Sequence, residues 1–116
     1  MTQYARGRRK EWDVVKRLKA GGWAAQRSAG SHGLWDVCAK KRGRCARFVQ
    51  VKYSADGRWE DKNTAALLAL AADDDPDDLE VWVYRKGIKD PVIYAAVHDY
   101  LNGWGWEWMP HLKLKP

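Results

Sequence analysis

Residues 27–52 read RSAGSHGLWDVCAKKRGRCARFVQVK. They cover two short apolar runs, residues 34–39 and 45–53, the second of which ends one residue further on, with a charged turn around Gly43 between them. Runs of this length, rich in valine and aromatic residues and separated by a turn, predict an antiparallel β-hairpin. The second run is apolar on both faces, so we expect it to be a central strand.

The polar residues of this hairpin are placed to meet on one side of it. Side chains alternate between the two faces of a strand, so Gln50 and Lys52 point the same way and Val51 points into the opposite layer. If Asp36 lies opposite Gln50, a carboxylate, an amide oxygen and an ammonium group converge. Oxygen ligands beside a lysine are what a hard divalent cation and an attacking water require.

The rest of the chain predicts two helices and further strands around this hairpin. Trp12, Val15 and Leu18 recur at three- to four-residue steps before Gly21 and Gly22, which is typical of an amphipathic helix with a glycine stop. A length of 116 residues suits one domain, 1–116, with a core at about 5–97 and a Trp-rich strand or tail at 98–116. We expect helices at 5–20 and 62–72, and strands at 23–28, 34–39, 45–53, 79–85 and 91–97.

The charge of the chain is unevenly distributed. Lysine and arginine outnumber aspartate and glutamate by 21 to 15, and the cations crowd the first half. This distribution predicts a polyanionic partner, most simply nucleic acid, although a solvated basic surface would read the same way. The clustered cations are Arg6, Arg8, Arg9, Lys10, Lys16, Arg17, Lys19, Arg27, Lys40, Lys41, Arg42, Arg44, Arg47 and Lys52.

Several classes of protein are disfavoured. No apolar run approaches the ~20 residues that cross a bilayer, and no signal-peptide pattern opens the chain, so we expect a cytoplasmic protein without a membrane partner. No GxxxxGK loop is present, so we expect no nucleotide cofactor.

Four features have an ordinary structural interpretation beside a functional one. Glu11 could serve the helix dipole or pair with an arginine. Gly30 and Gly33 flank a loop whose backbone can approach a phosphate closely. Ser31 alone favours a turn residue, and His32 favours a loop histidine over a metal ligand, because no second histidine is spaced to join it. Three alternating tryptophans, Trp104, Trp106 and Trp108, favour burial against the core or a partner subunit over stacking on bases.

Taken together, the motifs resemble those of the archaeal-type Holliday junction resolvases, a branch of the PD-(D/E)XK nuclease superfamily. The resemblance covers about residues 5–97. Gly7 and Glu11 match the family's G-x-x-x-E, and Asp36 matches its metal-binding aspartate. Arg27, Gly30 and Ser31 match its R-x-x-G-S loop, and Gln50 with Lys52 matches its E-x-K pair.

Two positions depart from the family pattern. Trp35 stands where a proline is usual before the aspartate, a common lapse in the superfamily. Gln50 stands where a glutamate is expected, so this position contributes a neutral oxygen and no negative charge. Metal affinity should fall unless another carboxylate compensates, and Glu11 is the candidate.

The resemblance implies a fold, an activity and a set of roles. It implies an α/β, restriction-endonuclease-like fold with a mixed central sheet of about five strands flanked by helices. It implies a homodimer that resolves four-way DNA junctions with Mg²⁺, or Mn²⁺ as a substitute. Glu11, Ser31, Asp36, Gln50 and Lys52 would be catalytic, and Asp36, Gln50, Val51 and Glu11 would hold the metal. Arg6, Arg8, Arg9, Lys10, Arg27, Gly30, Ser31 and His32 would bind DNA.

Two rival functions remain open. A related nuclease of the same superfamily would cut flaps, mismatches or ordinary duplex. A DNA-binding module that has lost catalysis would keep the basic surface, with Gln50 as the mark of decay.

Overall fold

The computed structural model describes residues 3–28, 34–73 and 78–109, except for the side chains of residues 3–6 and 71–73. The chain forms two helices and six strands, and the predicted elements are all present to within about three residues. In order they are α1 (Gln3–Ala20), β1 (Ala24–Arg27), β2 (Val37–Lys40), β3 (Arg47–Ser54), α2 (Lys62–Asp73), β4 (Asp78–Arg85), β5 (Val92–Asp99) and β6 (Gly103–Trp108).

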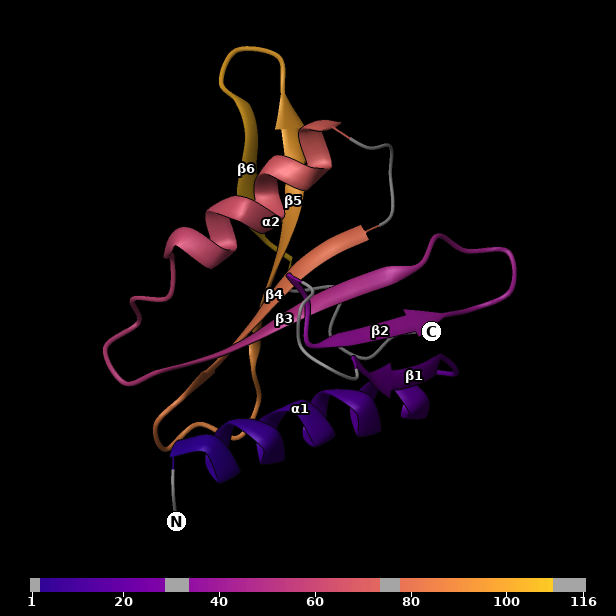
Figure 1. Cartoon of the computed structure of the whole chain (residues 1–116), viewed down its shortest axis with the longest axis vertical. Helices are drawn as coiled ribbons and strands as arrows, with labels where there is room; N and C mark the ends of the chain where they lie inside the picture. The colour runs from indigo at the N-terminus through magenta and orange to yellow at the C-terminus, as the bar shows by residue number, and fades with distance from the viewer. Residues whose placement is uncertain (1–2, 29–33, 74–77, 110–116) are drawn as a thin grey trace.

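The strands form one mixed sheet in the order in which they occur along the chain. Every neighbouring pair is antiparallel except β3 and β4, which are parallel and are joined by α2. The two helices lie on opposite faces of the sheet (Figure 1). The α/β class and the flanking helices are therefore as predicted, and the sheet has six strands where about five were expected.

Strand β4 shows how the sheet is buried on both sides. Val81 and Val83 face α2 and pack around Leu67 of that helix. Trp82 and Tyr84 belong to the other layer, with Val14, Val15 and Leu18 of α1. Residues 79–84 are all buried, which explains why this strand is apolar at nearly every position.

The sixth strand comes from the tryptophan-rich tail. β6 pairs with β5 over its whole length, so the sheet continues past residue 97. Trp106 packs against the α2-side core, with its ring centroid 6.2 Å from that of Trp59. Trp108 remains 59% exposed. Burial against the core therefore accounts for one of the three alternating indoles directly.

A glycine ends α1, as the sequence predicts. Gly22 has a φ of 90°, a left-handed conformation that other residues adopt only at a cost. Its N–H donates to the carbonyl of Lys19, and the N–H of Trp23 donates to the carbonyl of Leu18, both at 3.0 Å. This pair of bonds is a Schellman motif, and it turns the chain directly into β1.

One cation assigned to the basic surface is buried instead. Arg47 is 4% exposed and forms a bidentate pair with Glu80, with both N···O distances at 2.7 Å. The indole N–H of Trp82 also donates to Glu80 at 2.9 Å. The prediction that Arg47 belongs to the polyanion footprint was therefore wrong, because this residue joins β3 to β4 inside the core.

Neither helix in the described part of the chain is long and apolar enough to cross a membrane.

Candidate metal-dependent active site

The candidate site lies where β3 extends beyond its short neighbour β2. β2 pairs only with Arg47, Phe48 and Val49, so the β2-side edge of β3 is left open from residue 50 onward. The ladder ends at the pairing of Val37 with Val49, and the next residue, Asp36, bonds to Val49 and Val51, which flank Gln50 in β3. The predicted pairing of Asp36 with Gln50 is not part of this ladder. The predicted strand at 34–39 begins later, at Val37, because residues 34–36 leave the ladder and cross this open edge.

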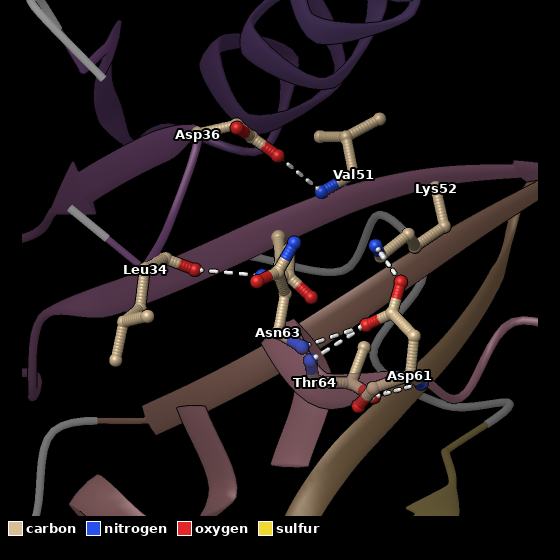
Figure 2. Close-up of polar contacts among 8 residues, drawn as sticks. Leu34, Asp36, Val51, Lys52, Asp61, Asn63 and Thr64 are labelled. Carbon is tan, nitrogen blue, oxygen red and sulfur yellow. Dashed lines mark hydrogen bonds and ion pairs between the residues drawn. The ribbon is translucent and has the colours of Figure 1, made fainter. Parts of the chain in front are cut away.

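Asp36 is fixed to the open edge by hydrogen bonds. Its N–H donates to the carbonyl of Val49, and its carboxylate Oδ2 accepts from the N–H of Val51, both at 2.8 Å. Figure 2 shows the carboxylate aimed at the main chain of Val51. The N–H and C=O of a strand residue point to the same edge, so the Val51 carbonyl lies on this side as well.

The charge state of Asp36 reflects its surroundings. Burial raises the pKa of this carboxyl above its ordinary value, and the carboxylate of Glu11 acts in the same direction. The hydrogen bond from Val51 and the cations of Lys52 and Arg27 lower the pKa but do not outweigh burial. The Asp36 carboxyl therefore sits where an added cation would be favourable.

Gln50 is buried and only partly satisfied. Its Nε2 donates to the carbonyl of Leu34 at 2.9 Å, which fixes the plane of the amide. Its Oε1 is buried without a hydrogen-bond partner among the described residues. An unpartnered buried oxygen costs about 1–3 kcal/mol, so a bound cation or water at this atom would offset a real penalty.

Lys52 lies on the α2 face of β3, as the alternation predicts. Its ammonium forms an ion pair with Asp61, whose carboxylate also accepts from the N–H groups of Asn63 and Thr64 at the start of α2 (Figure 2). Burial alone would raise the pKa of Asp61, but Lys52 and these N–H groups outweigh it and lower the pKa. The side chain of Lys52 is only 20% exposed, and a lysine this buried is stable only with an anionic partner, which Asp61 supplies.

Glu11 pairs with an arginine that is distant in sequence. Its Oε1 accepts from Nε of Arg27 at 3.0 Å, and the Arg27 guanidinium lies 5.3 Å from the ring centroid of Trp12. Glu11 therefore lies within electrostatic reach of Asp36 while it is bonded to Arg27. The predicted pairing with an arginine is present, although the partner comes from β1 and not from α1.

Some of the predicted DNA-binding residues lie outside the described part of the chain, and others lie on α1. Gly30, Ser31 and His32 lie outside the described residues, as does the side chain of Arg6. Arg8 and Arg9 are exposed on α1, whereas Lys10 is half-buried with its Nζ 5.0 Å from the centroid of the Tyr84 ring.

The oxygens at this edge suit a hard cation but form an unusual set. Within residues 3–28, 34–73 and 78–109, no three His, Cys, Asp or Glu side chains gather as a metal cluster. The available donors are the Asp36 carboxylate, the unpartnered Gln50 Oε1 and the Val51 carbonyl. One carboxylate with two neutral oxygens fits Mg²⁺, which prefers oxygen ligands and keeps several of its waters.

Comparison of the sequence with models of protein families identifies the family of this chain. The family model described as "Archaeal holliday junction resolvase (hjc)" matches residues 2–65, which is more than half of the chain and includes α1, β1, β2, β3 and the start of α2. The chain belongs to the archaeal Holliday junction resolvase family. The family is a nuclease family, and its activity is the resolution of Holliday junctions in DNA recombination and repair.

A solved structure supports the fold of the resolvase family. The chain is similar to Hjc, a Holliday junction resolvase from the archaeal hyperthermophile Archaeoglobus fulgidus, with a TM-score of 0.60 and 22% sequence identity. The match covers 76% of this chain and 70% of the other. Comparison with curated proteins found no match.

Asp61 is the residue of this site that the sequence reasoning missed. The pattern Asp61-Lys62-Asn63-Thr64 predicts a helix start, and the structure shows reciprocal bonds between Asp61 and Thr64 there. That pattern locates the N-terminus of α2, but it does not reveal that this N-terminus lies beside Lys52. The segment that joins β3 to α2 folds back and brings the two side chains together.

Proposed function

We propose that this chain is a divalent-metal-dependent endodeoxyribonuclease that resolves four-way DNA junctions by paired phosphodiester hydrolysis. The observation that carries the proposal is the open edge of β3, where Asp36, the partnerless Oε1 of Gln50 and Lys52 are gathered by neighbouring backbone positions. Membership in the resolvase family supplies the substrate class.

Each residue has a distinct role in this mechanism. Asp36, Gln50 and Val51 would hold Mg²⁺, which when bound polarises the scissile phosphate and lowers the pKa of a water. Lys52 orients the attacking water and stabilises negative charge that develops on the phosphate. Asp61 positions Lys52, because it holds the ammonium group beside the N-terminus of α2.

Glu11 and the basic residues act around this centre. Glu11 keeps Arg27 in place beside Asp36 and adds negative charge that Gln50 does not provide. Arg8, Arg9 and Lys10 contact phosphates without reading bases, and Ser31 would bind phosphate from its glycine-flanked loop. Two symmetric cuts require two such sites, so we propose a homodimer as the active form.

A metal titration on a four-way junction tests the proposal. Cleavage should be absent in EDTA and should appear with Mg²⁺ or Mn²⁺. An excess of unlabelled linear duplex should compete poorly for the labelled junction. Cleavage that persists without metal would overturn the mechanism, and equal competition by duplex would indicate the related nuclease that lacks junction selectivity.

One observation favours a second candidate, a DNA-binding module without catalysis. The described residues hold no three-acid metal cluster, and Gln50 contributes no charge. This candidate predicts tight junction binding with no cleavage at any metal concentration. The same titration therefore separates the two functions.

A further inference from the structure

A basic cavity lies next to the candidate site and is not part of it. Its volume is about 590 Å³, and it lies between α1 and the turn that joins β4 to β5. Five of its lining residues are cations and none is acidic. The cations are Arg9 and Lys10 of α1, Arg85 at the end of β4, and Lys86 and Lys89 of the turn.

These cations are only partly balanced by protein carboxylates. Among the described residues, none of the five forms an ion pair. Asp13 attracts Lys10 at longer range, but the carboxylates of Asp13 and Asp90 are both bonded to Arg17. Like charges held together without an anion repel one another, so a bound anion would relieve an unfavourable arrangement.

Arg85 adds a second and independent indication of a ligand. Its Nε is buried and has no hydrogen-bond partner among the described residues. A guanidinium presents a planar set of N–H donors that matches phosphate oxygens, and a donor left without an acceptor is unusual in a folded protein.

The cavity adjoins the candidate site along α1. Arg9 and Lys10 line the cavity, and the next residue, Glu11, belongs to the site. On β3, Tyr53 lines the cavity, on the face of the strand opposite to that of Lys52. Successive phosphates of one DNA strand advance only about 3.4 Å along the helix axis, so a strand bound at the site would have further phosphates within reach of the cavity.

We propose that this cavity binds the phosphate backbone of a DNA arm next to the strand that is cut. The inference rests on the proposed function for the position of the cut, and it extends the contact surface to Arg85, Lys86 and Lys89. The lining offers cations and an exposed tyrosine but no carboxylate or amide side chain to read bases, so binding here is independent of sequence.

A pair of charge-matched double variants tests the inference. Lys86→Gln with Lys89→Gln removes two exposed cations from the cavity. Arg42→Gln with Arg44→Gln removes two exposed cations from the turn between β2 and β3, at the other end of the sheet (Figure 1). Affinity for a labelled four-way junction is measured by fluorescence anisotropy in EDTA, over a range of salt concentrations. Circular dichroism verifies that each variant is folded.

The cavity variant should bind at least about tenfold more weakly, and its slope of log K against log salt should fall by about 2. The control variant, Arg42→Gln with Arg44→Gln, should lose much less affinity for the junction. The variant Lys86→Arg with Lys89→Arg should retain the parent affinity. Equal losses in the two double variants would overturn the inference, because net charge and not location would then explain binding. No loss in the cavity variant would overturn it as well.

The binding experiment can support or overturn the cavity proposal whether or not the chain cleaves junctions. Binding in EDTA requires no cleavage, so a selective loss at the cavity supports the backbone site even if the chain cuts no DNA. A free-anion site makes a different prediction. Inorganic phosphate at millimolar concentration and constant ionic strength would then bind the parent, and not the cavity variant, without weakening the parent's affinity for the junction, and that result would overturn the backbone assignment.

Discussion

At the scale of single residues, Gln50 is the residue of the candidate site that is buried with one amide atom bonded and the other without a partner among the described residues. Its Oε1 is buried and accepts no hydrogen bond from the described residues, and its Nε2 donates to the Leu34 carbonyl. The amide therefore does two things that a carboxylate could not do together. It offers an oxygen to a cation and donates to the backbone segment that carries Asp36.

Gln50→Glu should tighten metal binding and weaken the fold. A second negative ligand favours a divalent cation, so the Mg²⁺ concentration for half-maximal junction cleavage should fall on the order of tenfold. The bond to Leu34 would be lost, so the melting temperature of the metal-free protein should fall. An unchanged Mg²⁺ requirement would show that residue 50 does not contact the metal.

Asp61 is tested by substitutions that separate its two tasks. Asparagine is as good a helix cap as aspartate, so Asp61→Asn should keep stability within about 0.5 kcal/mol, whereas Asp61→Ala should lose about 1 kcal/mol. Both remove the charge that holds Lys52, so both should slow junction cleavage by about tenfold. Asp56→Asn is the matched control, because Asp56 also accepts a backbone N–H but lies outside the site.

A full cleavage rate in Asp61→Asn would contradict the positioning role of Asp61. A rate lost only in Asp61→Ala would attribute the effect to the helix cap.

At the scale of elements, α1 is attached to the sheet by a polar cluster as well as by its apolar face. Asp13 accepts from the Tyr84 hydroxyl of β4 at 2.6 Å and from Arg17 Nε at 2.9 Å. Arg17 continues to Asp90 at 3.1 Å. This cluster sets the height of α1 above the sheet, and with it the positions of Glu11 and of the basic cavity.

The Asp13 cluster predicts a dependence of stability on pH. Burial alone would raise the pKa of Asp13, but the bonds from Tyr84 and Arg17 outweigh it and lower the pKa below the ordinary 3.8. A depressed carboxyl pKa stabilises the fold above the unfolded-state value, and this stabilisation is lost as pH falls through the folded-state pKa. Asp13→Asn should therefore cost about 1 kcal/mol at neutral pH.

Urea unfolding of the parent and Asp13→Asn proteins at several pH values checks this prediction. The difference between them should shrink as pH falls below about 4. A difference that is constant from neutral to acid pH would show that the charge of Asp13 does not contribute.

Local patterns were sufficient to predict most elements. The alternation at Gln50, Val51 and Lys52 predicted their faces correctly, because the period of a strand is fixed. Gly21 and Gly22 predicted the end of α1 for an equally local reason. The start of β2 was placed three residues early, because the apolar Leu34 and Trp35 pack against the α2-side core from outside the ladder.

At the scale of the whole molecule, contacts between distant segments were not predictable. Arg47 meets Glu80 because β3 and β4 pair in parallel across a helical crossover, and no spacing in the sequence encodes that register. Lys52 meets Asp61 because the chain between β3 and α2 turns back and places the start of α2 beside β3, which the sequence spacing does not show either. Charge counting alone assigned Arg47 to the surface, whereas the fold separates the buried cation from those that line the cavity.

The whole molecule also explains how a weakly acidic site can act on a polyanion. In the proposed function, the cations of the cavity and of α1 hold DNA by charge, so the metal need not contribute much of the binding energy. The residues at the open edge of β3 then have to position only the metal, the water and the scissile phosphate.

We propose that Asp36 and Lys52 form one metal-dependent active site, and cleavage of a labelled four-way junction by their single variants tests this assignment. In Mg²⁺, Asp36→Ala and Lys52→Ala should each lose at least about a hundredfold in rate, while both bind the junction in EDTA with nearly the parent affinity. Cleavage at the parent rate by both variants would contradict the account.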